Sequence, residues 1–277
     1  MPLTPPPARP PLRIGIAGLG AVGLDVARRL IDGDVPGLML TAIAVRDADK
    51  ARQALPQIGD AIALRTLETI ADECDLVVEC LPPALFRAIA IPVIDRGLLF
   101  MPLSAAQLLH HGDLIERAKS TGARILVPSG ALIGFDAVRA AAEGTIHSVD
   151  MVTRKPPGGL EGAPYLVENN ISVRDLKAPL KVFAGSARDG ARGFPANVNV
   201  AAALSLAGIG PDRTHLEIWA DPTVTRNTHT ISVEADATRF TMTIESVPSH
   251  NLRTGMLVAP SVVAALRGLV SELKVGT

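Results

Sequence analysis

The chain has 277 residues, of which 48% are hydrophobic, and its formal net charge is −1. This length and composition are sufficient for two compact domains with separate cores. The basic residues form no stripe interleaved with aromatic ones, and a single Trp and a single Tyr offer little surface for stacking on bases. The composition therefore argues against a nucleic-acid partner. We expect a small molecule as the ligand.

Two features of the sequence bear on where the protein works. Its only cysteines are Cys74 and Cys80, and two unpaired thiols suit a reducing cytoplasm better than a disulfide or a metal site. Six prolines among the first eleven residues predict a flexible tail over residues 1–12 and not a signal peptide. The apolar stretch at 98–109 is shorter than the ~20 residues that a membrane helix needs. We expect a cytoplasmic protein without membrane contact.

From residue 13 to residue 130, short apolar runs alternate with helical patterns. The expected strands cover residues 13–17, 39–45, 75–79, 98–101 and 124–127. The expected helices cover residues 22–30, 47–54, 85–95 and 104–120, the last capped by Ser104. This alternation is typical of an α/β fold with a doubly wound parallel sheet. We predict a Rossmann-type domain over residues 13–130.

The pattern changes after residue 130, where apolar and polar residues alternate in three segments, at 214–220, 228–234 and 240–246. Such alternation predicts a partly solvated sheet with antiparallel pairing. We therefore expect a second, smaller α+β domain over residues 131–253, which holds the substrate and forms the contact of a homodimer.

Two further helices are expected in this half of the chain. Residues 197–206 predict a helix with Asn197 as its cap and Gly208 at its end. The last helix, within residues 254–277, carries Pro260 in its first two turns, and we expect it to complete the first domain.

A G-x-G-x-x-G segment follows the first predicted strand directly and opens the first helix. Gly18 permits the tight turn, Gly20 lets the backbone approach a pyrophosphate, and Gly23 lets the helix pack closely on the strand. The free N–H groups at the start of the helix attract the anion. In this first βα unit the motif predicts a dinucleotide site with contacts from Gly18, Gly20, Ala21, Val22 and Gly23.

The end of the second strand bears on the choice of cofactor. NAD-preferring folds carry an Asp or Glu there, about 20 residues past the glycines, which binds the ribose. Here Arg46 comes first and Asp47 second, and an arginine can hold a 2′-phosphate. We expect Arg46 to contact the cofactor, NADP or NAD; the alternative is an exposed Arg46 and an Asp47 that only caps the next helix. Leu81, beyond the strand at 75–79, is expected to line the nicotinamide side.

Past residue 128, several short motifs follow one another in order. They are Ser-Gly-Ala at 129–131, Gly-Phe-Asp at 134–136, Thr-Arg-Lys-Pro-Pro at 153–157, Val-Phe-Ala-Gly-Ser-Ala at 182–187, Phe-Pro-Ala-Asn-Val-Asn-Val-Ala-Ala-Ala at 194–203, Ala-Asp-Pro at 220–222, Arg-Asn-Thr-His at 226–229, and Val-Pro at 247–248 with Asn251 and Thr254. This ordered series closely resembles the L-aspartate dehydrogenase family, and the resemblance extends over nearly the whole chain from Arg13 onward.

The resemblance implies NAD(P)-dependent oxidation of L-aspartate to iminoaspartate, which water converts to oxaloacetate and ammonia. In this family the iminoaspartate can also feed NAD biosynthesis. The resemblance places Ala131 and Asn199 at the cofactor, with Asn197 as the alternative to Asn199, and it identifies His229 as the catalytic histidine. The family carries a Ser-x-Gly-Ala segment where this chain has Ser-Ala-Ala at 104–106, so contacts there could differ.

The residue types at these positions suit that chemistry. An unperturbed histidine has a pKa of ~6.5, near working pH, and can serve as a general base. His229 enters a predicted strand behind a polar cluster; without the family motif, a structural role would be the more common one for any of the six histidines. Two substrate carboxylates call for cationic or N–H donors, and Lys155, Arg226 and Asn227 are the candidates. The alternative is that Lys155 and Arg226 are surface charges.

Two other functions stay open beside an aspartate dehydrogenase. One is a related oxidoreductase or imine reductase that acts on another small amino or keto acid. The other is a non-catalytic dinucleotide-sensing protein, against which a histidine beside Arg226 and Asn227 argues, because a sensor needs no acid/base group. We expect no metal site. The sequence leaves open the choice between NAD and NADP, the substrate scope and the physiological direction.

Overall fold

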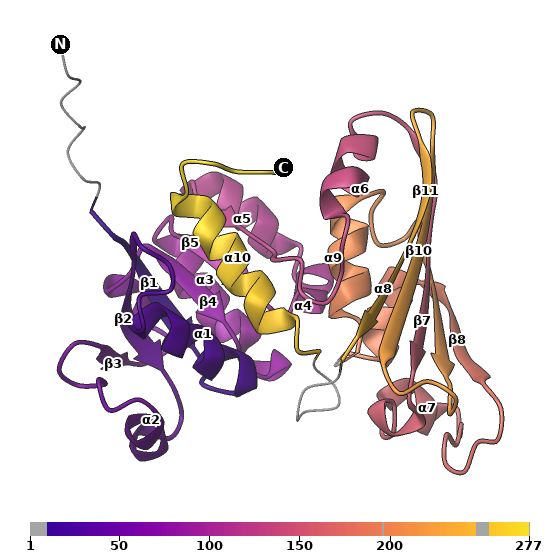
Figure 1. The fold of residues 1–277 in the computed structure, drawn as a ribbon, viewed down its shortest axis with the longest axis horizontal. Coiled ribbons are helices and arrows are strands. Elements are labelled where there is room, and N and C mark those ends of the chain that lie inside the picture. The colour runs from indigo at the N-terminus through magenta and orange to yellow at the C-terminus, as the bar shows by residue number, and fades with distance from the viewer. Residues whose placement is uncertain (1–9, 196, 248–254, 277) are drawn as a thin grey trace.

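The computed structural model describes residues 10–195, 197–247 and 255–276. They form two lobes, each built on its own β-sheet (Figure 1). Up to residue 9, the tail predicted over residues 1–12 lies outside the described residues. The same holds for Asn251 and Thr254 of the family motifs.

The first lobe contains a parallel sheet with the strand order β3-β2-β1-β4-β5-β6. Its strands are β1 (Leu12–Ala17), β2 (Leu38–Ala44), β3 (Ala63–Arg65), β4 (Leu76–Glu79), β5 (Leu99–Pro102) and β6 (Arg124–Ile125). This is the strand order of the Rossmann fold, so the predicted fold class is confirmed. The three-residue edge strand β3 is too short to leave an apolar run, and the sequence does not predict it. Because the order reverses between β1 and β4, a ligand crevice is expected at their carboxyl ends.

Helices cover both faces of this sheet (Figure 1). On one face lie α1 (Ala21–Ile31) and α10 (Val258–Val270), whose apolar side chains pack with those of β1 and β2. The other face is covered by α3 (Phe86–Asp95) and α5 (Asp113–Thr121). α10 carries Pro260 in its first turn, as predicted, and it brings the end of the chain back to the first lobe. α2 (Ala48–Ala54) follows β2.

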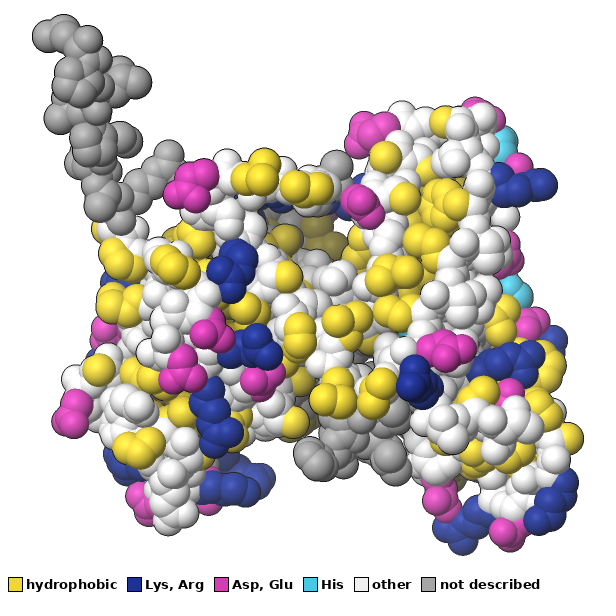
Figure 2. Space-filling model, viewed as in Figure 1, with side chains coloured by type: hydrophobic (Ala, Val, Ile, Leu, Met, Phe, Trp, Pro, Cys, Tyr) yellow, Lys and Arg dark blue, Asp and Glu magenta, His cyan; other side chains and the backbone are white. Residues whose placement is uncertain are grey.

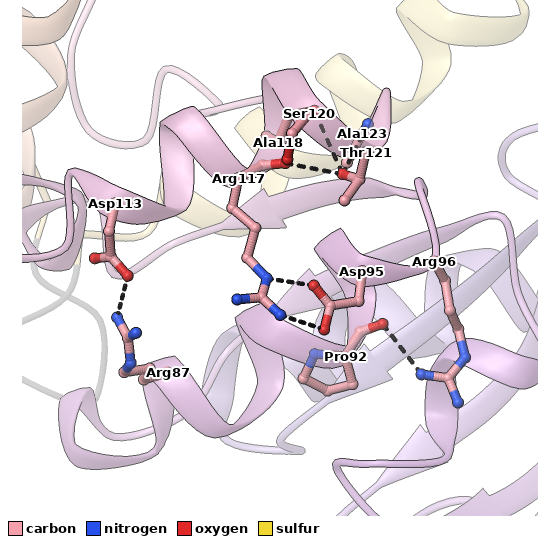
Figure 3. A network of polar contacts seen from close by, with 10 residues as sticks. All are labelled: Arg87, Pro92, Asp95, Arg96, Asp113, Arg117, Ala118, Ser120, Thr121 and Ala123. Atoms are coloured by element: carbon pink, nitrogen blue, oxygen red, sulfur yellow. Dashed lines mark hydrogen bonds and ion pairs between the residues drawn. The ribbon is translucent and has the colours of Figure 1, made fainter.

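Exposed ion pairs join α3 to α5 (Figure 3). Two N–H groups of Arg117 donate to the carboxylate of Asp95, and Nη1 of Arg87 lies 2.7 Å from Oδ2 of Asp113. Exposed pairs of this kind add little to stability. Apolar contacts hold these helices on the sheet instead. An example is the contact between the buried rings of Phe86 on α3 and Phe100 on β5, whose centroids are 5.7 Å apart.

The helix predicted over 104–120 is wrong in two respects. The structure contains two helices there, α4 (Ala106–His110) and α5, because the chain turns at His111 and Gly112 and α5 begins after Gly112. Ser104 caps neither of them. Its hydroxyl donates to Oε1 of Glu79 at 3.1 Å and is therefore not available to the helix.

The second lobe contains a mixed sheet with the strand order β11-β10-β7-β9-β8. Its strands are β7 (Ile146–Lys155), β8 (Leu180–Ser186), β9 (Thr214–Ala220), β10 (Asn227–Ala235) and β11 (Arg239–Ser246). The predicted antiparallel pairing is confirmed for β10 with β11, whereas β7 and β9 pair in parallel. The sequence pattern does not predict β7 or β8.

The helices of the second lobe, α6 (Phe135–Ala142), α8 (Ala187–Gly193) and α9 (Asn199–Ala207), lie on the side of this sheet that faces the first lobe (Figure 1). The short α7 (Pro164–Glu168) packs near one end. α9 ends at Gly208, as predicted, but Asn197 is not its cap, because the helix begins at Asn199 after Val198 and has no side-chain cap. Asn197 has another partner, described below.

Candidate functional site

A cavity of about 1130 Å³ is lined by residues of both lobes. The face drawn in Figure 2 is hollowed between the lobes, and hydrophobic side chains gather in that depression, whereas acidic and basic side chains are interspersed over both lobes. All but one of the predicted site residues line this cavity: Gly18, Gly20, Ala21, Val22, Gly23, Arg46, Leu81, Ala131, Lys155, Asn199, Asn227 and His229.

The glycine turn has the geometry that a pyrophosphate requires. Gly18 has φ of +95°, and a Cβ there would lie 2.6 Å from the carbonyl oxygen of Cys80. A Cβ on Gly23 would lie 2.0 Å from the carbonyl oxygen of Gly18, so only glycine allows α1 to approach β1 this closely. A Cβ on Gly20 would meet nothing within 4 Å, which leaves space in front of the first turn of α1. No side chain caps that turn, so its N–H groups are free to bind an anion.

Arg46 and Asp47 follow β2 and line the cavity. Arg46 is exposed and lines the cavity. The carboxylate of Asp47 accepts a hydrogen bond of 3.0 Å from the backbone N–H of Lys50 and thereby caps α2. Arg65 also lines the cavity, but its Nε donates to Oε1 of Glu73 at 3.1 Å. Of Arg46 and Arg65, therefore, Arg46 is the one without a carboxylate partner among the described contacts.

Sequence reasoning missed Glu79, the last residue of β4. Its carboxylate is fully buried and accepts hydrogen bonds from Leu81 N at 2.7 Å, Ser104 N at 3.0 Å and Ser104 Oγ at 3.1 Å. Burial raises the pKa of this carboxyl, while the donors oppose the shift. Glu79 therefore holds together the loops after β4 and β5, which line the cavity. An acidic residue at the end of an apolar strand was the available signal.

Four polar side chains of the second sheet share one face near the cavity. The register pairs His229 with Thr153, and Thr228 with Arg154. Because side chains two apart on a strand point to the same face, Thr153 and Lys155 of β7 lie beside Asn227 and His229 of β10. Each of these four is at least 95% buried. Such a buried polar cluster at the edge of a cavity is typical of a functional site.

His229 is held by one neighbour. Its Nδ1 lies 3.1 Å from Oγ1 of Thr153. Burial, reinforced by the charge of Lys155, lowers the pKa of His229 to about 3, so its imidazole is neutral at neutral pH. When Nδ1 donates to Thr153, the lone pair on Nε2 is available to accept a proton. The ring is thus arranged as a neutral base.

Lys155 is held by the residue that the sequence suggested as a helix cap. Its Nζ donates to Oδ1 of Asn197 at 3.0 Å, and burial lowers the pKa of Lys155 to about 8. The other asparagine, Asn199, accepts a hydrogen bond of 3.1 Å from the backbone N–H of Ala106 and so ties α9 to α4. Both asparagines line the cavity, and each has a distinct partner.

Arg226 differs from the other predicted site residues. It is exposed and is not among the residues that line the cavity. The turn before β10 directs it outward, whereas the strand itself carries Asn227 inward. In the described part of the chain, no cluster of three or more His, Cys, Asp or Glu side chains is arranged to hold a metal ion. Both cysteines are free.

Comparison with known proteins agrees with this geometry. The family model described as "Aspartate dehydrogenase, C-terminal" matches residues 136–269, and "Homoserine dehydrogenase, NAD binding domain" matches residues 18–128. The L-aspartate dehydrogenase of Bradyrhizobium diazoefficiens is 52% identical, over 96% of this chain and 94% of that protein. L-aspartate dehydrogenase 3 of Bordetella bronchiseptica is 48% identical, over 98% of this chain and 99% of that protein.

A solved structure shares the fold. The aspartate dehydrogenase of Thermotoga maritima superimposes with a TM-score of 0.72 over 96% of this chain and 99% of that one, at 22% sequence identity. Within the described residues, no helix is long and apolar enough to cross a membrane. With the predicted resemblance confirmed by relatives over nearly its full length, the chain belongs to the L-aspartate dehydrogenase family.

Proposed function

We propose that this protein is an NAD(P)-dependent L-aspartate dehydrogenase, which oxidises L-aspartate to iminoaspartate, hydrolysed by water to oxaloacetate and ammonia. One observation carries the proposal: the glycine turn of the first lobe and the buried Lys155 and His229 of the second lobe line the same cavity. A dinucleotide on the turn and an amino acid at these side chains would therefore meet between the lobes.

The residues present fit a nicotinamide dinucleotide. The space in front of Gly20 and the uncapped first turn of α1 suit a pyrophosphate. Leu81, Ala131 and Asn199 line the same cavity, and we assign them to the nicotinamide. When bound, the oxidised cofactor supplies the acceptor for the hydride that leaves Cα of the substrate. The loops fixed by Glu79 keep this end of the crevice in place.

Arg46 supports the use of NADP. It lines the cavity beside the end of β2, while the carboxylate of Asp47, which would otherwise bind the ribose hydroxyls, caps α2. A guanidinium at this position can hold the 2′-phosphate through charge-assisted hydrogen bonds. NAD would bind the same turn without that contact. Both cofactors are therefore expected to bind, with NADP favoured.

Lys155, Asn227 and His229 provide the substrate end. The ammonium of Lys155 and the amide of Asn227 can donate to substrate carboxylates. Loss of hydride from Cα of a substrate with a neutral amino group produces the protonated imine. His229, neutral and buried, accepts a proton from the water that adds to the imine carbon and returns it to the nitrogen. The nitrogen leaves as ammonia, the hydroxyl proton is released, and oxaloacetate forms. Arg226 has no part in this scheme.

We propose that one lobe binds the cofactor and the other binds the substrate. We assign cofactor binding to residues 13–130 with the C-terminal segment 254–277, because α10 packs on α1. Substrate binding is assigned to residues 131–253.

In the described part of the chain no helix covers the outer face of the second sheet (Figure 1), which supports the proposal of a homodimer through this lobe. A solution mass of one chain at micromolar concentration, by light scattering, would reject it. A cytoplasmic location rests on the two free thiols.

The deciding experiment follows the absorbance of the reduced nicotinamide near 340 nm. L-aspartate, D-aspartate, L-glutamate and L-alanine are offered separately, each with NAD and with NADP. The proposal requires reduction of the cofactor with L-aspartate well above that with the other amino acids. Reduction of the cofactor by another of these amino acids alone would identify a related oxidoreductase. Cofactor binding without turnover of any substrate would leave a dinucleotide-sensing protein.

A further inference from the structure

One hydroxyl beside the substrate end lacks a partner in the protein. Ser246, the last residue of β11, is 5% exposed, and its Oγ is the single buried side-chain polar atom without a hydrogen-bond partner within the described residues. A buried hydroxyl without a partner destabilises the folded state, because it has given up its hydrogen bonds to water. An apolar residue here would remove that cost. A bound ligand would supply the hydrogen-bond partner that the serine lacks.

The register of β10 and β11 places this hydroxyl at the cavity. Ser246 pairs with Asn227, and Ile244 pairs with His229. Since alternate side chains of a strand share a face, Ser246 lies on the same face as Asn227 and His229. All three line the cavity. The hydroxyl is thus part of the group of side chains assigned above to the substrate.

The surroundings of Ser246 on its own strand are apolar. The preceding residues on this face, Phe240, Met242 and Ile244, pack against the core of the second lobe. Gly255 lies beside Ser246, since a Cβ added to Gly255 would lie 3.2 Å from Ser246 Cβ, 3.6 Å from Ser246 Oγ and 3.8 Å from Ala131 Cβ. The row of inward side chains becomes polar only where it reaches the cavity, at Ser246.

The neighbouring groups indicate the ligand's chemistry. Lys155 offers an ammonium and Asn227 offers amide N–H groups, so hydrogen-bond donors gather at this end. A carboxylate is the matching acceptor, since its two oxygens accept about four hydrogen bonds. We propose that the hydroxyl of Ser246 donates a hydrogen bond to one carboxylate of the dicarboxylic substrate, beside Asn227. This inference rests on the proposed function and deepens it.

The test is Ser246→Ala, measured for stability and for catalysis. Loss of a hydrogen bond to a charged group should raise KM for L-aspartate by about 10- to 100-fold, with KM for NAD(P) unchanged. Without ligands, the variant should be at least as stable to urea as the wild type, because its lost hydroxyl had no partner. The matched control is Ser205→Ala, since that serine is 1% exposed, donates to Ala202 O at 2.8 Å and does not line the cavity. Its KM values should equal those of the wild type.

Different results would overturn the inference. A rise in KM for NAD(P) with no change for L-aspartate would assign the hydroxyl to the cofactor. A less stable Ser246→Ala with unchanged KM values would give it a structural role. Calorimetric titration of L-aspartate into the enzyme with reduced cofactor separates these results from failure of the proposed function. If the wild type neither binds nor oxidises L-aspartate, the function itself falls, and the assignment of Ser246 falls with it.

Discussion

Replacing His229 by asparagine tests the proposed base directly. The amide of asparagine occupies the place of Nδ1, so Thr153, 3.1 Å from that atom, keeps a hydrogen-bond partner. What the change removes is Nε2, the nitrogen assigned to proton transfer. Loss of a general base costs about 10²- to 10⁴-fold in turnover. Cofactor affinity should stay within error, because the glycine turn lies in the other lobe.

The same variant has a calculable effect on stability. Burial holds the pKa of His229 at about 3, below the ~6.5 expected in the unfolded chain. The neutral form therefore stabilises the fold above pH ~6.5, and this contribution is lost as the pH falls towards 3. From pH 7.5 to 5.5 the loss is about 1.4 kcal/mol for one proton. His229→Asn should show a correspondingly smaller drop in its free energy of unfolding.

Two assays measure these effects. Turnover is followed by cofactor absorbance and divided by the concentration of folded sites, and urea unfolding is measured at pH 7.5 and 5.5. His215→Asn, at an exposed histidine on β9 of the same sheet, serves as the matched control for turnover, which should equal that of the wild type. Near-normal turnover in well-folded His229→Asn would refute the catalytic role. An unchanged pH dependence of stability would refute the burial argument.

Three other changes test the cofactor and carboxylate assignments. Gly20→Val should leave the free energy of unfolding unchanged and weaken cofactor binding in calorimetry by at least about tenfold, because the side chain enters the open space assigned to the pyrophosphate. Gly23→Ala should instead destabilise the protein by about 1–3 kcal/mol, because its Cβ would overlap the carbonyl oxygen of Gly18. The reverse pattern would contradict the turn geometry. Arg46→Ala should raise KM for NADP far more than KM for NAD, and equal changes would count against a 2′-phosphate contact. KM for L-aspartate should rise above pH about 8 as Lys155 loses its proton, and Lys155→Met should abolish this rise; a rise that persists in the variant would assign it to another group.

Most of the first lobe can be predicted because its signals are local. A strand buried on both faces requires a continuous apolar run, as in β1 and β4, and the glycine turn must follow β1 immediately. The break between α4 and α5 escapes this reasoning, because the polar residues 110–113 interrupt the apolar pattern only briefly and Leu114 and Ile115 resume it. β7 escapes it as well, because two of its inward positions carry the polar residues Thr153 and Lys155.

By itself, the sequence determined the fold class, the dinucleotide turn and the family, through residues adjacent along the chain and motifs in a fixed order. Tertiary structure alone decided which polar side chains meet. The carboxylate of Glu79, at the end of β4, accepts a hydrogen bond from Ser104, which follows β5. Thr153 of β7 contacts His229 of β10, and Ser246 of β11 lies opposite Asn227 because of the register between β10 and β11. These contacts depend on strand register and on how deeply each group is buried. Neighbouring residues do not set either quantity, and burial is what shifts the pKa of His229 and leaves Ser246 without a partner.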